Sequence, residues 1–182
     1  MGNGNRGNIM IIKNGLVFTP EGKFEKKDLY VEGEYVAKET TDNKEVEAEG
    51  CYVIPGLVDI HFHGCVRHDM CDGTEESIQA LADYEAANGV LAICPATMTI
   101  PEEELFQAMK AAKGHKNGKG ADLVGINMEG PFINKEKKGA QKEEDIKLAD
   151  VELFHKLQEA AGGLIKWILR QRLKELWILS IK

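Results

Sequence analysis

The chain has 182 residues, of which 43% are hydrophobic, and a formal net charge of -7. This composition is that of a globular protein, and the negative charge argues against nucleic acid or an anionic membrane as the main partner, since both attract basic surfaces. No apolar run approaches the roughly 18 residues of a membrane span, the start MGNGNRGN lacks a signal-peptide core, and the four cysteines lack zinc-finger spacing, so we expect a cytoplasmic protein.

The first part of the chain has the pattern of a small β unit. An Asn-Gly pair at positions 14 and 15 is typical of a two-residue hairpin turn. Acidic and apolar residues alternate before Pro55. We predict a small antiparallel, β-sandwich-like unit over residues 1–54. Its three β-rich runs are residues 9–18, 28–36 and 45–54.

After Pro55 the sequence changes to strands that alternate with helices. Such alternation predicts a parallel sheet with crossover helices. Thr74 can cap the first helix, which ends at Gly89, and Pro101 can open the second. Three β/α units are therefore expected. The strands after the one that follows Pro55 are predicted at 90–99, with a bend at Pro95, and at 123–128, and the third helix at 150–161.

Polar residues with metal-ligand chemistry stand at the ends of two predicted strands. Because strand side chains alternate between faces, Asp59, His61 and His63 point the same way. Glu129 ends the third strand, and sites in α/β folds form at the carboxyl ends of strands. Two imidazoles and a carboxylate suit a divalent metal such as zinc, which generates hydroxide near neutral pH. The sequence therefore suggests a metal-dependent hydrolase.

Other interpretations of these residues stay open at this point. An isolated H-x-H pair also occurs without a metal, and Glu129 could instead cap the turn at Gly130-Pro131. Cys65 is more typical of a buried thiol than of a ligand. The sequence suggests neither a Ser-His-Asp nucleophile nor a phosphate-binding glycine loop.

Four segments of the chain resemble one family. PGLVDIHFHG after a small β unit resembles the amidohydrolase superfamily of metal-dependent (β/α)8 barrels. The other three segments, CDGT, PATMT and MEGPFINKEKKGAQ, resemble N-acetylglucosamine-6-phosphate deacetylases, and the resemblance covers about residues 9–166. In chain order the four segments occupy residues 55–64, 71–74, 95–99 and 128–141.

The resemblance implies a reaction and roles for individual residues. The reaction would be hydrolysis of N-acetylglucosamine 6-phosphate to glucosamine 6-phosphate and acetate, by an enzyme that is a homodimer in full-length members. Glu129 would be a metal ligand, His61 and His63 would hold a second metal, and Ala140 would contact the amino sugar. One or two divalent ions, zinc in our expectation, would be the cofactor. Arg67 departs from the family pattern, which has glycine there.

The length of the chain limits this expectation. A (β/α)8 barrel takes about 250 residues, and residues 55–182 are about half of that. We therefore predict an α/β fold with the first three units of the barrel over residues 55–166. The catalytic acid/base aspartate, which the family has on a later strand, would be missing. Such a fragment would be inactive and prone to self-association through its open strand edge.

Residues 164–182 differ in style from the rest of the chain, with five positive charges and one negative. This basic amphipathic segment could lie on a membrane or pack as a helix on a partner, and we favour the packed helix of these two. A third interpretation fits better. When the residues from Trp167 onward are translated back into freely chosen codons and the reading frame is moved by one base, the new peptide contains the Ala-Pro-Glu sequence expected in the family. Residues 167–182 would then be a frameshift product. The alternative functions are an amidohydrolase acting on a cyclic amide or nucleobase, and a non-catalytic assembly protein that uses this tail.

Overall fold

The computed structural model describes residues 9–33, 35–40 and 44–169. The chain divides into two compact units, Met1–Pro55 and Gly56–Lys182. No helix within the described ranges is long and apolar enough to cross a membrane.

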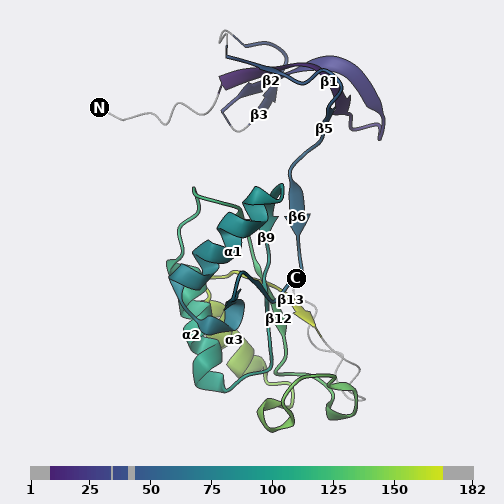
Figure 1. Cartoon of the computed structure of the whole chain (residues 1–182). Helices are drawn as coiled ribbons and strands as arrows, with labels where there is room; N and C mark the ends of the chain where they lie inside the picture. Colours follow the sequence, from purple (N-terminus) through teal and green to yellow (C-terminus); the bar gives the residue numbers. More distant parts are fainter. Residues whose placement is uncertain (1–8, 34, 41–43, 170–182) are drawn as a thin grey trace, which may run out of the picture. The chain divides into compact units, whose positions relative to one another are not determined.

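The first unit is a five-stranded sheet in the order β3-β2-β1-β4, with β5 also pairing with β1 (Figure 1). β2 pairs antiparallel with β1, but β4 and β5 run parallel to it. The prediction of an antiparallel unit is therefore wrong for two strands, because the chain crosses back before it pairs again with β1. The five strands are β1 (Ile9–Phe18), β2 (Phe24–Glu32), β3 (Tyr35–Ala37), β4 (Glu45–Glu47) and β5 (Tyr52–Val53).

The Asn-Gly pair in β1 forms a bulge and not the predicted hairpin. The pairing register with β2 shifts between Ile12 and Gly15, and β1 continues through the shift. Asn14 has a φ of 61°, a left-handed conformation that asparagine tolerates better than most residues. Its backbone N–H donates to Asp28 Oδ1 at 2.9 Å, and its side-chain amide donates to Glu47. A one-residue bulge thus satisfies the same sequence signal as a turn.

The second unit has two three-stranded parallel sheets, with order β11-β9-β6 and β10-β12-β13. The three helices lie on one side of these strands (Figure 1). The strands are β6 (Leu57–Asp59), β9 (Val90–Ile93), β10 (Ala96–Thr97), β11 (Asp122–Leu123), β12 (Ile126–Glu129) and β13 (Ile165–Leu169), with a hairpin of β7 (Gly64–Cys65) and β8 (His68–Asp69). The helices are α1 (Glu75–Ala87), α2 (Glu102–Gly114) and α3 (Val151–Ala160), with short 3-10 turns at Met70–Asp72, Lys135–Lys137 and Glu143–Asp145.

The three predicted helices are confirmed, and the predicted cap at Thr74 is present. The Thr74 side chain accepts a hydrogen bond from Ser77 N at 3.1 Å, and Asp150 does the same for Leu153 N at 3.0 Å. These caps satisfy N–H groups that have no partner within the helix. Pro101 occupies the N-cap position of α2.

Two predicted strands are broken, and the breaks pass the chain from one sheet to the other. The run 90–99 divides into β9 and β10 on either side of Pro95, as its proline predicted. The run 123–128, predicted as one strand, divides into β11 and β12 at Val124-Gly125. A side chain at Gly125 would crowd Cys94 Sγ and Lys166. Close packing therefore requires glycine at this break.

The core of the second unit lies between its helices and strands. Each helix turns apolar side chains inward, and these form one buried cluster with side chains of the strands. Members that are fully buried include Ile78, Ile93, Leu105, Met109, Ile126, Met128, Leu157 and Ile165.

The segment predicted as an aberrant tail begins inside a strand. β13 continues to Leu169 and pairs with β12 throughout, so the packed-helix interpretation is wrong over 167–169. Residues 170–182 lie outside the described part of the chain. The frameshift interpretation of 167–182 stays a prediction.

Candidate metal centre

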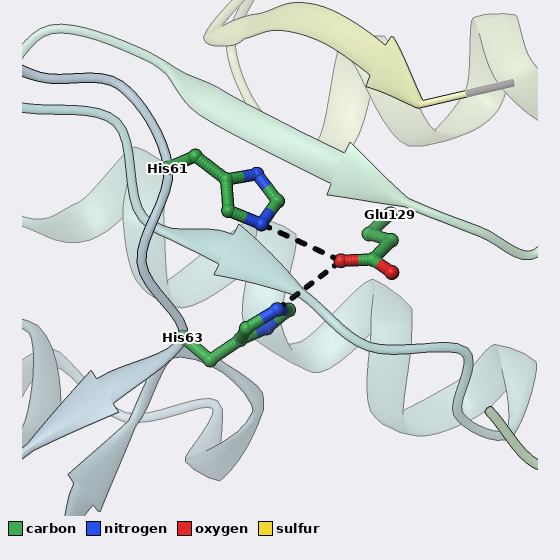
Figure 2. A group of neighbouring side chains, drawn as sticks. All are labelled: His61, His63 and Glu129. Carbon is green, nitrogen blue, oxygen red and sulfur yellow. Dashed lines mark ion pairs between the residues drawn. The ribbon is translucent and has the colours of Figure 1, made fainter. Parts of the chain in front are cut away.

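Three side chains with metal-ligand chemistry converge at the ends of the strands. His63 Nε2 lies 3.1 Å from Glu129 Oε2, and His61 Nε2 lies 3.6 Å from the same oxygen. Figure 2 shows both imidazole rings turned toward the carboxylate. The three side chains are the predicted metal ligands, and Glu129 lies 66 residues after His63 and 68 after His61 in the sequence.

The histidines were predicted to end a strand. They lie instead in the segment after β6, which has no regular secondary structure. β6 ends at Asp59, two residues before His61, so strand alternation does not orient the rings. Asp59 Oδ1 instead accepts a hydrogen bond from His61 N at 2.9 Å. Asp59 is thereby engaged with the backbone of the segment and does not join the ligand group.

Hydrogen bonds to backbone carbonyl groups hold residues 59–63 in place. Each of the four residues other than His61 accepts a hydrogen bond from another part of the second unit, so both rings are carried on an anchored backbone. The bonds are Cys94 N to Asp59 O (2.8 Å), Asn127 Nδ2 to Ile60 O (3.0 Å), Ala96 N to Phe62 O (2.6 Å) and Met70 N to His63 O (3.1 Å).

Glu129 is the last residue of β12, and its side chain is one-fifth exposed. Its two carboxylate oxygens have different partners. Oε2 faces the histidines, and Oε1 accepts a hydrogen bond from Gln141 Nε2 at 2.8 Å. This position favours the ligand interpretation of Glu129 over that of a turn cap, because one oxygen is directed at two imidazole nitrogens.

The spacing of the three ligand atoms fits a small divalent ion. Four ligands at about 2.0–2.1 Å from a tetrahedral zinc are about 3.3 Å from one another. The two measured separations, 3.1 and 3.6 Å, bracket that value. His63 Nε2 is the nitrogen that faces the group, and its Nδ1 is buried without a hydrogen-bond partner among the described residues. Two imidazoles and one carboxylate, with a position left open, could bind a metal.

The other residues that the sequence singled out lie outside this group. Cys65 is partly buried in β7, and burial raises the pKa of its thiol. Arg67 lies in the β7–β8 turn with a φ of 69°, a left-handed conformation that glycine adopts without strain, which accounts for the glycine expected there. Ala140 is exposed in the turn that precedes Gln141.

Sequence reasoning missed two buried residues that contact Glu129 or the histidine segment. Gln141 is 4% exposed and bonds to Glu129, and Asn127 is 6% exposed and bonds to the histidine segment. Asn127 had a detectable signal, since a polar residue inside an apolar strand requires a partner. Gln141 had no signal beyond its place after Ala140 in the family-like segment.

Comparisons with known proteins find similarity to deacetylases of amino-sugar phosphates. No family model matches the chain. A curated deacetylase from Bacillus subtilis is 34% identical over 162 residues, which cover 86% of this chain and 39% of that protein. One from Lysinibacillus sphaericus is 26% identical over 166 residues, covering 87% and 43%. Both of these proteins are N-acetylglucosamine-6-phosphate deacetylases. The chain spans about two-fifths of their length.

Solved structures of N-acetylglucosamine-6-phosphate deacetylases have the same fold. The enzyme from Pasteurella multocida superimposes with a TM-score of 0.78 at 20% identity, covering 88% of this chain and 44% of that one. The enzyme from Mycobacterium smegmatis gives 0.72 at 19% identity, covering 89% and 43%. At such low identity the likeness shows the fold.

Proposed function

We propose that the chain supplies part of the metal centre of an N-acetylglucosamine-6-phosphate deacetylase. The convergence of His61, His63 and Glu129 carries the proposal, and the 34% identity with the deacetylase of Bacillus subtilis supports the substrate class. The substrate would be an amino-sugar phosphate, whose acetamide is hydrolysed to a free amine and acetate. The parallel, sequentially ordered strands are proposed to be the first strands of a (β/α)8 barrel.

The three ligands would hold one divalent ion, with zinc as our choice from the donor set and spacing. A bound ion polarises the amide carbonyl and supplies hydroxide near neutral pH. The anchored segment 59–63 would hold both imidazoles in place for the ion, and the Glu129 carboxylate would supply a negatively charged ligand. Ala140, with its small exposed side chain, would line the space beside the amino sugar.

The chain by itself would not complete the reaction. Departure of the amine requires a proton, which a positioned carboxylic acid supplies in general acid catalysis. Among the described residues, the ligand group contains one carboxylate, Glu129, which Gln141 engages through Oε1 and a bound metal would engage through Oε2. We therefore propose that the chain binds metal and lacks turnover. A dimeric state and a cytoplasmic location stay predictions.

The first experiment measures metal content. The purified 182-residue chain is loaded with Zn2+, desalted and subjected to elemental analysis beside His61→Ala, Glu129→Ala and the control His155→Ala. His155 is exposed on α3, so its removal should leave the metal content unchanged. We expect the two ligand variants to lose most of the metal. Full metal content in both would contradict the site.

The second experiment measures turnover. The zinc-loaded chain is incubated with N-acetylglucosamine 6-phosphate, and release of acetate is followed. We expect no release above the metal-free control. Robust turnover would contradict the proposed inactivity of the chain while supporting the proposed reaction.

A further inference from the structure

Gln141 connects the metal centre to a second strand end. It is 4% exposed, and its side-chain amide makes two short hydrogen bonds. Nε2 donates to Glu129 Oε1 at 2.8 Å, and Oε1 accepts from the backbone N–H of Thr99 at 2.6 Å. The Thr99 N–H can only donate and the Glu129 carboxylate can only accept, so these partners determine which end of the amide faces which group.

The hydrogen bond to Gln141 leaves Glu129 with one oxygen for a metal. Oε1 is engaged by the amide, and Oε2 is the oxygen that faces His61 and His63. A carboxylate without this bond could rotate, or could bind through both oxygens. The amide therefore selects the orientation in which Oε2 alone is directed at the ion.

Gln141 is itself held at both ends, so it can transmit this constraint. Its backbone N–H donates to Lys138 O at 3.1 Å, and Lys138 Nζ donates to Gln141 O at 3.1 Å. The backbone around Thr99 is closely packed against the turn after Glu129, because a side chain at Gly130 would collide with the Thr99 side chain. The Gln141 amide thus reaches the Glu129 carboxylate from a fixed backbone and from a fixed partner, Thr99 N.

We propose that Gln141 is a positioning residue that raises the affinity of the centre for a divalent metal by holding Glu129 in a one-oxygen orientation. The inference rests on the proposed metal site. The competing explanation is that Gln141 only fastens its loop to the fold.

The chain contains a matched glutamine for separating these explanations. Gln158 on α3 also makes two hydrogen bonds, accepting from Ile165 N at 2.9 Å and donating to Ile165 O at 3.1 Å. It fastens a helix to a strand and does not contact the ligand group. Gln158→Leu therefore removes a glutamine bridge without touching Glu129.

The test titrates Co2+ into the full 182-residue chain and follows its visible absorption, with Zn2+ as a competitor. The variants are Gln141→Leu, Gln141→Asn and Gln158→Leu. Loss of an outer partner of a metal ligand typically weakens binding about 10–100-fold, and we expect this for Gln141→Leu. Its Co2+ absorption should also change, because Glu129 is then free to bind through two oxygens. Gln141→Asn keeps the amide but is too short to span both partners, and it should weaken binding as well.

Gln158→Leu should lower the stability of the fold and leave the Co2+ affinity and spectrum as in the wild type. The proposal is overturned if Gln141→Leu binds Co2+ with wild-type affinity and spectrum, or if Gln158→Leu weakens binding equally. Should Gln141→Leu not fold, the same criteria applied to Gln141→Asn decide. A wild-type chain that does not bind Co2+ overturns the proposed metal site together with this inference, whereas a failure confined to the Gln141 variants leaves the site intact.

Discussion

The two units of the chain differ in how they bury their side chains. In the described part of the first unit, Val17, Thr19 and Ala48 are the buried side chains, whereas the second unit contains a contiguous buried cluster from three helices and two sheets. Aromatic residues of the first unit, Phe18 and Tyr52 among them, stay largely exposed. A single sheet has no second layer to cover its face, and helices packed on strands provide one.

This difference in burial explains why the group of His61, His63 and Glu129 is found in the second unit. The group of His61, His63 and Glu129 lies in the second unit, where backbone hydrogen bonds hold the segment of the histidines, and Glu129 Oε2 lies 3.1 and 3.6 Å from the two imidazole nitrogens. A layered core restricts the positions of the residues that leave its strands. The contrast between the units can be tested by changes made in each.

The largest effect is expected for a core substitution in the second unit. Leu157 is fully buried, so Leu157→Ala should reduce the free energy of unfolding by about 2–5 kcal/mol. Val17→Ala in the first unit removes fewer methyl groups and should cost about 1–2 kcal/mol. Hydrogen exchange measured at α3 and at β1 reports each loss. A greater loss for Val17→Ala would contradict the comparison.

The next effect concerns two glycines with left-handed backbones. Gly130 has a φ of 85° and Gly50 a φ of 77°, so an alanine at either position costs about 1–2 kcal/mol in backbone strain. At Gly130 the new methyl group also collides with Thr99, which adds about 1–3 kcal/mol, while space is open at Gly50.

Urea unfolding of both glycine variants measures the difference. Gly130→Ala should in addition weaken Co2+ binding, because it displaces the residue next to Glu129. Equal losses of stability for the two variants would show that the packing near Glu129 is looser than described.

A smaller effect is expected from zinc itself. Zinc at 100 times its dissociation constant stabilises a protein that binds it only when folded by about 2.7 kcal/mol. Hydrogen exchange should slow in β12 and in residues 59–63, and it should stay unchanged in β1 and β2. Glu129→Ala is the control. Equal protection of both units would contradict a site confined to the second.

The smallest effect is a difference in cysteine labelling. Cys51 is exposed in the first unit, whereas burial raises the pKa of Cys71 in the second to about 12, despite the hydrogen bond from Met98 N that lowers it. Its folded pKa lies above the unfolded value of 9.0, so the thiol keeps its proton until the pH approaches 12. At pH 8 a maleimide should label Cys51 first. Labelling in urea is the control, because both thiols are then exposed and should react at similar rates. Equal labelling rates of Cys51 and Cys71 in the folded chain would contradict the burial of Cys71.

Much of the secondary structure follows from local signals. Thr74 and Asp150 mark the starts of two helices because capping depends on groups within one turn, and Pro101 precedes α2 because its missing N–H costs nothing there. The Asn14-Gly15 bulge could not be distinguished from a hairpin, since both conformations place residues at positive φ and the choice depends on what pairs beyond. The parallel pairing of β4 and β5 likewise depends on long-range contacts.

The sequence by itself singled out His61, His63 and Glu129 as candidate metal ligands, because their residue types and the family-like segments around them indicate metal chemistry. Only the tertiary structure decided how they are held: Asn127 bonds across 67 residues to Ile60, and Gln141 bonds across 42 residues to Thr99. A polar residue inside an apolar strand, such as Asn127, indicates that it needs a partner, but the local sequence does not specify which partner. The contacts of Asn127 and Gln141 arise because packing of the helices on the strands brings distant strand ends together, and a buried amide must then find its partners there.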